Sequence, residues 1–437
     1  MGRFGSSGVL CLVALVIFAG ARPARGDLDE PERSLRDRVY ERRPAMVETL
    51  KRWVDINTGT WNTDGLERFA SILGAELGEL GFEVQSEDGV TLELPERSSA
   101  RTGPLIVARR AGSAREEPGP RLLLIGHLDT VFEEDSPFQA FRLDPGDSHR
   151  AYGPGVVDMK GGLIVLFETL RALRESGDLD AASITVLLNS DEEIGSLGSR
   201  PRVEAEAQRA DCGFVFESAH SSGALVRSRR GLGQFHLKVE GVAAHAGSAH
   251  RKGRSAVREL AEKVVRLEKL SDYERGVTVN VGTVRGGTKR NIVPDNAEAW
   301  IDVRYDTPEL GREIEAAVEK IAETAFVEGT RTQIWGTLHR PPKVATERVD
   351  ALLDRHAEVG RDLGVMLPSS VHAGGGTDGS LTGAQGLPTL DSMGPRGGES
   401  HTEREFVWLP SLPERTALTA VFLRRLIRRA SPGCARE

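Results

Sequence analysis

The sequence predicts an α/β protein in which one layered domain is interrupted by a smaller inserted domain. Apolar runs of strand length alternate with helical patterns up to about residue 228. From Gly231 the order becomes strand, helix, strand, strand, helix, strand, and after Arg340 the earlier pattern returns. Alternating strands and helices are typical of a sheet with helices packed on it, whereas the inner order is that of a ferredoxin-like unit.

The first part of the layered domain contains short apolar runs rich in Val, Ile and Leu, which predict buried strands. In chain order they are TLELP, PLIVARR, RLLLIGH, SITVLLNS and CGFVFES. Helical spacing marks two segments beside them, LERFASILGAELGELG, which ends on a glycine, and GGLIVLFETLRALRES. We therefore expect a sheet that is largely buried between helices.

The inserted domain is predicted to span residues 231–340, about 110 residues, which suits a compact unit. Its strands are predicted in GQFHLKVEG, GVTVNVGTVRGG, NAEAWIDVRYD and TRTQIWGTLHR. Its helices are predicted in GRSAVRELAEKVVRLEKL and PELGREIEAAVEKIAETA. The layered domain then comprises residues 27–230 and 341–437, and its second part begins with the helical pattern ERVDALLDRHAEVGRDLG.

Composition and charge argue against a nucleic-acid partner. The chain has 437 residues, 39% of them hydrophobic, and a formal net charge of −8. Nucleic-acid binding needs clustered Lys and Arg, which an acidic chain of this kind lacks. The segment FLRRLIRRA near the C-terminus is the exception, and its amphipathic spacing predicts a solvated helix face instead of a binding patch.

Residues 1–26 are predicted to be a signal peptide, so we expect the protein to be exported, either to a periplasm or by secretion. Arg3 precedes the apolar run VLCLVALVIFAGA, and small residues suited to cleavage follow it. That run is short for a membrane span, and an uncleaved membrane anchor is the competing interpretation. Cys212 and Cys434 remain after cleavage, and Cys212 is expected to be a small buried hydrophobe.

Polar side chains gather at or near the ends of the predicted strands. The residues concerned are His127, Asp129, Asp158, Glu192, Glu193, Glu217 and His401. Taken singly, each has a structural explanation, because acidic pairs suit the start of a helix and Gly-rich stretches form turns. Ligands bind outside the carboxyl ends of the strands in an open α/β sheet, so one crevice would collect the separate clusters.

The residue types in these clusters predict a site for two divalent metals. The sequence offers two His and three carboxylates as ligands, which zinc accepts, and no CxxC pair. Two four-coordinate ions that each keep one open place need about six protein donors, and five side chains supply six if one carboxylate bridges. Glu192, next to a ligand carboxylate but not needed as one, is the candidate general base.

The motifs resemble those of a known family. In chain order they are HLDTVF, YGPGVVDMKGG, NSDEEIGSLGSR, FESA, HAG, NIVP, GGGTD and HTEREF. They resemble the cocatalytic zinc peptidases related to carboxypeptidase G, aminoacylase and succinyl-diaminopimelate desuccinylase, and most closely the carboxypeptidase G (glutamate carboxypeptidase) branch. The resemblance covers nearly the whole mature chain. It implies a mixed-sheet catalytic domain, an inserted ferredoxin-like lid that forms a homodimer, and two Zn²⁺ per chain, with Co²⁺ or Mn²⁺ as substitutes.

The resemblance also implies how the ligands are shared between the two ions. His127 and Glu217 would complete one zinc site, Glu193 and His401 would complete the other, and Asp158 would bridge both.

Two further residues of the clusters have implied roles. Asp129 would hydrogen-bond to the His127 ring and hold its orientation. Glu192 would act first as general base and then as general acid. As after the bridging aspartate of relatives, we expect a cis peptide bond between Asp158 and Met159.

Three residues are implied substrate contacts. His245 in VAAHAGSAH would reach an active site across the dimer and help hold the oxyanion, although a loop histidine in water is the alternative. Asn291 in NIVP would supply a polar contact from the lid. Arg340 in LHRPP would grip the free carboxylate of the substrate, a role that suits its planar guanidinium.

The predicted function is that of a metallo-carboxypeptidase that cleaves an amide or peptide bond and releases a C-terminal amino acid, with glutamate as the candidate. An N-acyl-amino-acid deacylase and a dipeptidase are the alternatives, because fold and metals do not set the acyl group. A relative that only binds peptides is disfavoured, since Glu192 and a complete ligand set are present. Arg227, Arg229 and Arg230 either favour an acidic side chain in the substrate or face water, so the preferred amino acid stays open.

Overall fold

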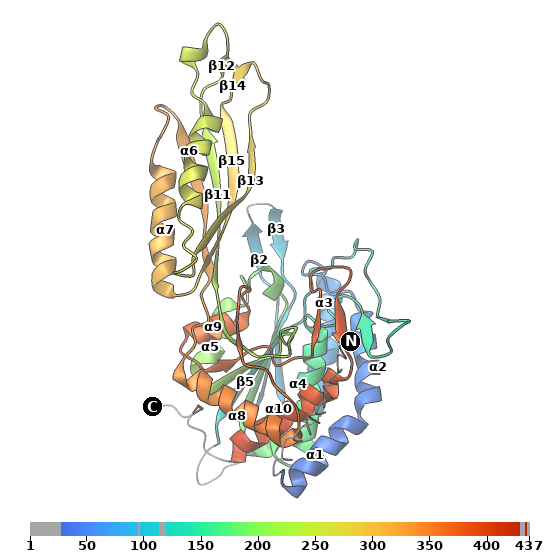
Figure 1. Ribbon diagram of the computed structural model, residues 1–437. Helices are drawn as coiled ribbons and strands as arrows, with labels where there is room; N and C mark the ends of the chain where they lie inside the picture. Colours follow the sequence, from blue (N-terminus) through green and yellow to red (C-terminus); the bar gives the residue numbers. More distant parts are fainter. Residues whose placement is uncertain (1–27, 95–96, 113–118, 429–432, 435–437) are drawn as a thin grey trace, which may run out of the picture.

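The computed structural model describes residues 28–94, 97–112, 119–428 and 433–434, so the predicted signal peptide lies outside the described residues. Figure 1 shows a broad body built around one sheet and a slender body that extends away from it. Among the described residues, none of the helices combines the length and the apolar character that a membrane crossing needs.

The central sheet is mixed, with six strands in the order β1-β4-β8-β5-β9-β18. Their bounds are Glu83–Glu87 for β1, Leu105–Arg110 for β4, Ser183–Asn189 for β8, Arg121–His127 for β5, Cys212–Val215 for β9 and Thr389–Leu390 for β18. β8, β5, β9 and β18 run parallel, whereas β4 is antiparallel to β8 and β1 is antiparallel to β4. The segments that follow β5, β8 and β9 therefore leave the sheet at the same edge.

Helices cover both faces of this sheet. Their bounds are Glu30–Glu41 for α1, Arg43–Val54 for α2, Thr63–Glu79 for α3, Lys160–Glu175 for α4, Arg200–Arg209 for α5, Glu347–Leu363 for α8, Asp378–Ala384 for α9 and Ser411–Arg428 for α10. The larger core lies under α1 to α4, α8 and α10, and the smaller lies under α5 and α9. In β5, Leu122 and Leu124 enter the larger core while Leu123 and Ile125 enter the smaller, which explains the unbroken apolar run.

The remaining strands of the broad body form small sheets outside the central one. They are β2 (Thr91–Leu94), β3 (Arg97–Arg101), β6 (Arg142–Leu143), β7 (Arg150–Tyr152), β10 (Val226–Arg229), β17 (Val371–Ala373), β19 (Gly397–Gly398) and β20 (Phe406–Trp408). β19, β20, β7 and β6 form one antiparallel sheet, and β10 pairs with β17. The composition of TLELP predicts a buried strand, and this prediction is wrong. β2 pairs only with β3, and Thr91 and Glu93 are exposed.

The slender body contains β11 (Gly231–Glu240), α6 (Ala256–Glu268), β13 (Thr278–Gly286), β15 (Asn296–Tyr305), α7 (Pro308–Glu323) and β16 (Arg331–Arg340). Its sheet is antiparallel with the order β13-β15-β11-β16. Leu260 of α6 and Val318 of α7 pack with Leu237 and Ile301 of the strands in a separate core. A short pair, β12 (Ala244–His245) with β14 (Ile292–Val293), lies at the far end of this body (Figure 1).

Two further sequence-based expectations are wrong. Cys212 is buried but forms a disulfide with Cys434, so it is not a free hydrophobic thiol. The basic segment in α10 is no solvated face, because Arg424 is only 3% exposed and pairs with Asp178. Its neighbour Arg425 binds the carboxylates of α1 and α8 in the same way.

Candidate metal centre

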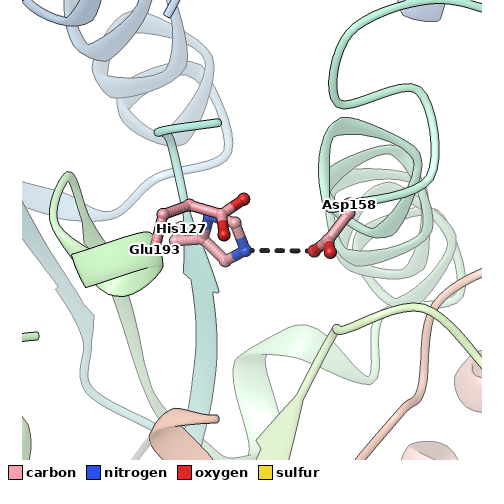
Figure 2. Close-up of side chains that lie close together, drawn as sticks. All are labelled: His127, Asp158 and Glu193. Carbon is pink, nitrogen blue, oxygen red and sulfur yellow. Dashed lines mark ion pairs between the residues drawn. The ribbon is translucent and has the colours of Figure 1, made fainter. Parts of the chain in front are cut away.

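The five predicted metal ligands converge at the edge where the parallel strands end. They are His127 at the end of β5, Asp158 before α4, Glu193 in the turn after β8, Glu217 after β9, and His401 in the loop between β19 and β20. Figure 2 shows His127 and Asp158 pointing toward each other, with Glu193 beside His127. The ligand atoms of these three residues lie within 4.8 Å of one another.

The five side chains divide into two groups that share one carboxylate. His127 Nε2 lies 3.4 Å from Asp158 Oδ1 and 3.5 Å from Glu217 Oε1. His401 Nε2 lies 3.4 Å from Asp158 Oδ2 and 3.2 Å from Glu193 Oε2. Each oxygen of Asp158 thus faces a different histidine, as expected of a bridging ligand.

These spacings fit a tetrahedrally coordinated divalent cation in each group. With bonds of about 2.0–2.2 Å, neighbouring ligand atoms of a tetrahedral zinc are about 3.3–3.6 Å apart. The buried Nε2 of His127 has no hydrogen-bond partner, although such atoms are normally paired. A lone pair directed at a cation explains this unpaired nitrogen.

The electrostatics of the site also favour a cation. Burial lowers the pKa of His127, but Glu217, Asp129 and Asp158 outweigh that effect and hold its pKa well above 6.5. Hydrogen bonds to Asp158 and Glu193 raise the pKa of His401 to about 11. The site therefore stabilises positive charge on both rings, and a bound divalent cation meets the same negative field.

Asp129 contacts both the ring of His127 and the main chain of Glu192 and Glu193. It is fully buried, and its carboxylate accepts the main-chain N–H groups of Glu192 and Glu193, both at 3.2 Å, and the hydroxyl of Thr60 at 2.9 Å. His127 Nδ1 lies 3.0 Å from the main-chain carbonyl of Asp129 and 3.3 Å from its Oδ1. The ring is therefore oriented by both parts of Asp129, and the carbonyl is the closer.

Glu192 and Arg340 are neighbours in the site. An Arg340 Nη lies 3.0 Å from Glu192 Oε1 and donates to the main-chain carbonyl of Glu192 at 3.1 Å. Burial raises the pKa of Glu192 to about 8, against the opposing charge of Arg340. Arg340 also contacts Asp378 and Ser196 and is only 2% exposed, so its donors already meet protein groups.

The structure does not bring His245 or Asn291 to the cluster. His245 is exposed in β12, and Asn291 is exposed next to β14, at the end of the slender body away from the central sheet (Figure 1). The two lie close to each other, since Ala246 donates its N–H to the Asn291 carbonyl at 2.9 Å. His245 Nδ1 accepts the N–H groups of Gly247 and Ser248, which leaves Nε2 as the donor of that ring.

The three arginines after Glu217 neither face water freely nor stay open for a substrate. Each pairs with an aspartate: Arg227 with Asp350, Arg229 with Asp391 and Arg230 with Asp306. Arg229 is 8% exposed and also donates to the carbonyl of Gly375. These contacts give the arginines a structural role, and only the pair between Arg230 and Asp306 joins the two bodies.

Sequence reasoning missed two buried carboxylates beside the cluster. Asp378, in the GGGTD motif, accepts from Asn189 and Ser196 and contacts Arg340. Glu405, in the HTEREF motif, accepts three main-chain N–H groups of the segment that carries Asp158. Their motifs were visible, but nothing in them distinguished these acids from exposed ones. The expected cis peptide bond between Asp158 and Met159 is confirmed.

Comparisons with known proteins show similarity to peptidases and related hydrolases. A family model described as peptidase family M20/M25/M40 matches residues 123–425. Carboxypeptidase G2 of Pseudomonas sp. (strain RS-16) is 32% identical over 383 residues, which are 87% of this chain and 89% of that protein. Succinyl-diaminopimelate desuccinylase of Gluconacetobacter diazotrophicus is 27% identical over 82% of this chain and 91% of that protein.

A solved structure shares the fold. The crystal structure of aminopeptidase PepT from Bacillus cereus superposes with a TM-score of 0.69 and 21% identity, and the match covers 89% of this chain and 99% of that chain. At this identity the likeness concerns the fold alone. The residues matched by the family model include all five predicted metal ligands and the whole of the slender body.

Proposed function

The chain belongs to peptidase family M20/M25/M40 and is a metallopeptidase similar to carboxypeptidase G2, and from that premise we propose that it is a dinuclear zinc carboxypeptidase. It would release a C-terminal amino acid that carries a free carboxylate. The observation that carries this proposal is Asp158, whose two carboxylate oxygens face His127 and His401 separately at 3.4 Å. One bridging carboxylate between two histidine-containing groups suits two ions better than one.

His127, Asp158 and Glu217 would hold one ion, and Asp158, Glu193 and His401 would hold the other. The chemistry that bound zinc supplies in such a pair is activation of water and polarisation of the scissile carbonyl. Imidazole and carboxylate ligands suit zinc, and Co²⁺ or Mn²⁺ would be substitutes.

Glu192 would accept the proton of the attacking water and pass it to the leaving nitrogen. A carboxylate oxygen of Glu192 lies within 4.8 Å of the ligand atoms of His127 and Glu217. Arg340 would bind the carboxylate of the substrate, for which its guanidinium must exchange at least one of its present contacts with Glu192 and Asp378. Asp129 would orient His127 and hold the turn that carries Glu192.

We infer that glutamate is the released amino acid to test first, because the sequence motifs resemble most closely the glutamate carboxypeptidase branch of the family. The likeness to a desuccinylase makes an N-acyl-amino-acid deacylase the next candidate. A dipeptidase is the third, and all three activities are compatible with the same metal site.

We propose that the slender body is a ferredoxin-like lid that forms a homodimer. β13 is an edge strand, and Val284 on it is 55% exposed, while Val257 and Val265 of α6 are 41% and 53% exposed. An unpaired edge beside exposed apolar side chains is suited to association with a second copy. His245 and Asn291 would then meet the active site of the partner subunit, where the Nε2–H of His245 would stabilise the oxyanion.

We also propose export through cleavage of residues 1–26. The disulfide between Cys212 and Cys434 supports this proposal, because disulfides persist mainly in oxidising compartments. Mass spectrometry of the protein secreted or held in the periplasm of its host would give the mature N-terminus. A membrane-bound, full-length chain would favour the anchor instead.

The decisive experiment combines a metal assay with a substrate panel. The purified protein would be analysed for zinc and assayed on aryl and folate-type glutamate conjugates, N-acetyl and N-benzoyl amino acids, and free dipeptides. About two zinc ions per chain, activity lost on chelation and regained with zinc, and release of glutamate from the conjugates would support the proposal. Activity restricted to simple N-acyl substrates or to dipeptides would replace it with the corresponding alternative.

A further inference from the structure

A single buried side chain, Glu405, holds the segment that carries the bridging ligand. Its carboxylate accepts the N–H of Gly155 at 3.2 Å on one oxygen, and those of Val157 at 2.9 Å and Asp158 at 3.0 Å on the other. The side chain is 1% exposed. A carboxyl group that gathers three main-chain donors restricts their relative positions, because each N–H must point at one of its two oxygens.

The segment that Glu405 holds is a tight turn, and the N–H groups of Val157 and Asp158 have no main-chain partner within it. Gly155 has a φ of +70°, and a Cβ there would lie 2.6 Å from the side chain of Thr130. The turn is closed by main-chain bonds from Val156 to Gly153 and from Lys160 to Gly155. Those bonds use neither the N–H of Val157 nor that of Asp158, so the two donors nearest the ligand depend on Glu405.

Glu405 also connects the segment that carries Asp158 with the loop that carries His401. β7 ends one residue before Gly153, and β20 begins one residue after Glu405. The two strands pair through Tyr152 and Phe406, so the Asp158 segment and the His401 loop leave the same ladder side by side. His401 lies in the same loop as Glu405, four residues before it. We therefore expect Glu405 to determine the position of Asp158 relative to His401.

We propose that Glu405 is a positioning residue for the metal pair, acting through Asp158 in the way that Asp129 acts through His127 and the Glu192–Glu193 turn. Asp129 and Glu405 are then two buried acids that orient different ligands of the centre. This inference rests on the proposed function, since it concerns the ligands of the proposed metal pair. Loss of such a partner of a ligand typically weakens metal binding 10- to 100-fold.

The test is metal binding by Glu405→Gln and Glu405→Asp. Gln keeps the volume, but its amide NH₂ opposes an N–H donor, and Asp keeps the charge but is one methylene too short to reach all three donors. Metal-free protein would be titrated with Zn²⁺ alone by calorimetry. The visible spectrum of the Co²⁺ form would report ligand geometry. We expect both variants to bind metal at least about 10-fold more weakly than wild type, with a changed Co²⁺ spectrum.

Glu259→Gln is the matched control. Glu259 is fully buried in the slender body, accepts the N–H groups of Phe326 and Val327 at 2.8 and 2.6 Å, and pairs through its other oxygen with Lys263 at 2.9 Å. We expect Glu259→Gln, like Glu405→Gln, to lower the melting temperature, but to leave metal affinity and the Co²⁺ spectrum unchanged. This comparison separates positioning of the ligands from a general loss of stability.

Wild-type affinity and spectrum in Glu405→Gln would overturn the inference. If that variant does not fold, wild-type behaviour of Glu405→Asp would overturn it equally. If the wild-type protein itself binds no metal, the proposed function is contradicted. If wild type binds two metal ions and the Glu405 variants bind them equally well, only the inference about Glu405 is contradicted.

Discussion

At the scale of single residues, burial and the positive charge of Arg340 have opposite effects on the pKa of Glu192. Burial raises its pKa to about 8, and the guanidinium of Arg340, 3.0 Å away, opposes the shift. A carboxylate in this position can accept a proton near neutral pH and return it, which a freely solvated glutamate does less well. Its main-chain N–H is bound by Asp129, so the position of Glu192 is fixed independently of its side chain.

We expect Glu192→Gln to abolish most turnover while retaining metal. The variant keeps the main-chain bond to Asp129 and all five predicted ligands, but it lacks the proton acceptor, so kcat should fall at least about 10²–10⁴-fold. Zinc analysis and steady-state kinetics on the same preparation would check this. Near-wild-type kcat with full zinc content would remove Glu192 from the role of general base.

His356 of α8 makes a separate prediction about pH and stability. Burial, aided by the charge of Arg415, lowers its pKa to about 3, and its ring packs edge-on against Phe422. Because this pKa lies below the unfolded value of about 6.5, the stability that the neutral ring contributes is present above pH 6.5 and is lost as pH falls toward 3. By linkage, the free energy of unfolding of wild type should fall by about 2 kcal/mol more than that of His356→Leu when the pH is lowered from 7.5 to 5. Urea unfolding of both proteins at the two pH values measures this, and equal losses would show that the ring is protonated in the folded protein.

The candidate ligands could be predicted from the sequence because each follows or precedes a recognisable element. His127 ends an apolar strand, and Glu193 and Glu217 come directly after two others. Glu405 could not be predicted, because Glu403 lies two residues earlier in the same motif and is exposed. Only the pairing of β20 with β7 turns one acid toward the Asp158 segment and leaves the other in solvent.

At the scale of elements, the strands of the broad body with two buried faces were predictable, whereas two of its exposed strands were not. β5, β8 and β9 are continuous apolar runs, which matches their position inside the sheet. β1, at the sheet edge, has the polar sequence EVQSE and was missed. TLELP was misassigned because its alternation fits the exposed β2–β3 hairpin as well as a buried strand.

The disulfide joins β9 of the central sheet to the C-terminal end of the chain and makes a prediction of its own. The bond closes a loop with a sequence separation of 222 residues, so it strongly restricts the unfolded chain. Cys434→Ser should therefore lower the free energy of unfolding by about 2–5 kcal/mol. Urea unfolding of oxidised wild type, reduced wild type and the variant would test this. Reduced wild type should match the variant, and an oxidised wild type no more stable than either would contradict the prediction.

At the scale of the whole molecule, the residues proposed to act together lie in different bodies of the subunit. Glu192 lies at the edge of the central sheet, whereas His245 lies at the tip of the slender body in β12 (Figure 1). Its Nε2 is available as a donor, since Nδ1 already accepts two main-chain N–H groups. A C2 dimer would place each tip against the other subunit, because such an interface is reciprocal.

Mixed dimers test this arrangement directly. His245→Ala and Glu192→Gln should each be nearly inactive alone. In a mixed dimer, however, one active site would take Glu192 from the first variant and His245 from the second. Random reassembly of equal amounts should restore about a quarter of the wild-type activity, since half the dimers are mixed and each holds one complete site. Subunits with different affinity tags would allow the mixed dimer to be purified and assayed. Because the two substitutions lie in different bodies of the chain, recovery would require that the active site be built from both subunits. An inactive purified mixed dimer would mean that His245 serves the site of its own chain, by a movement of the slender body.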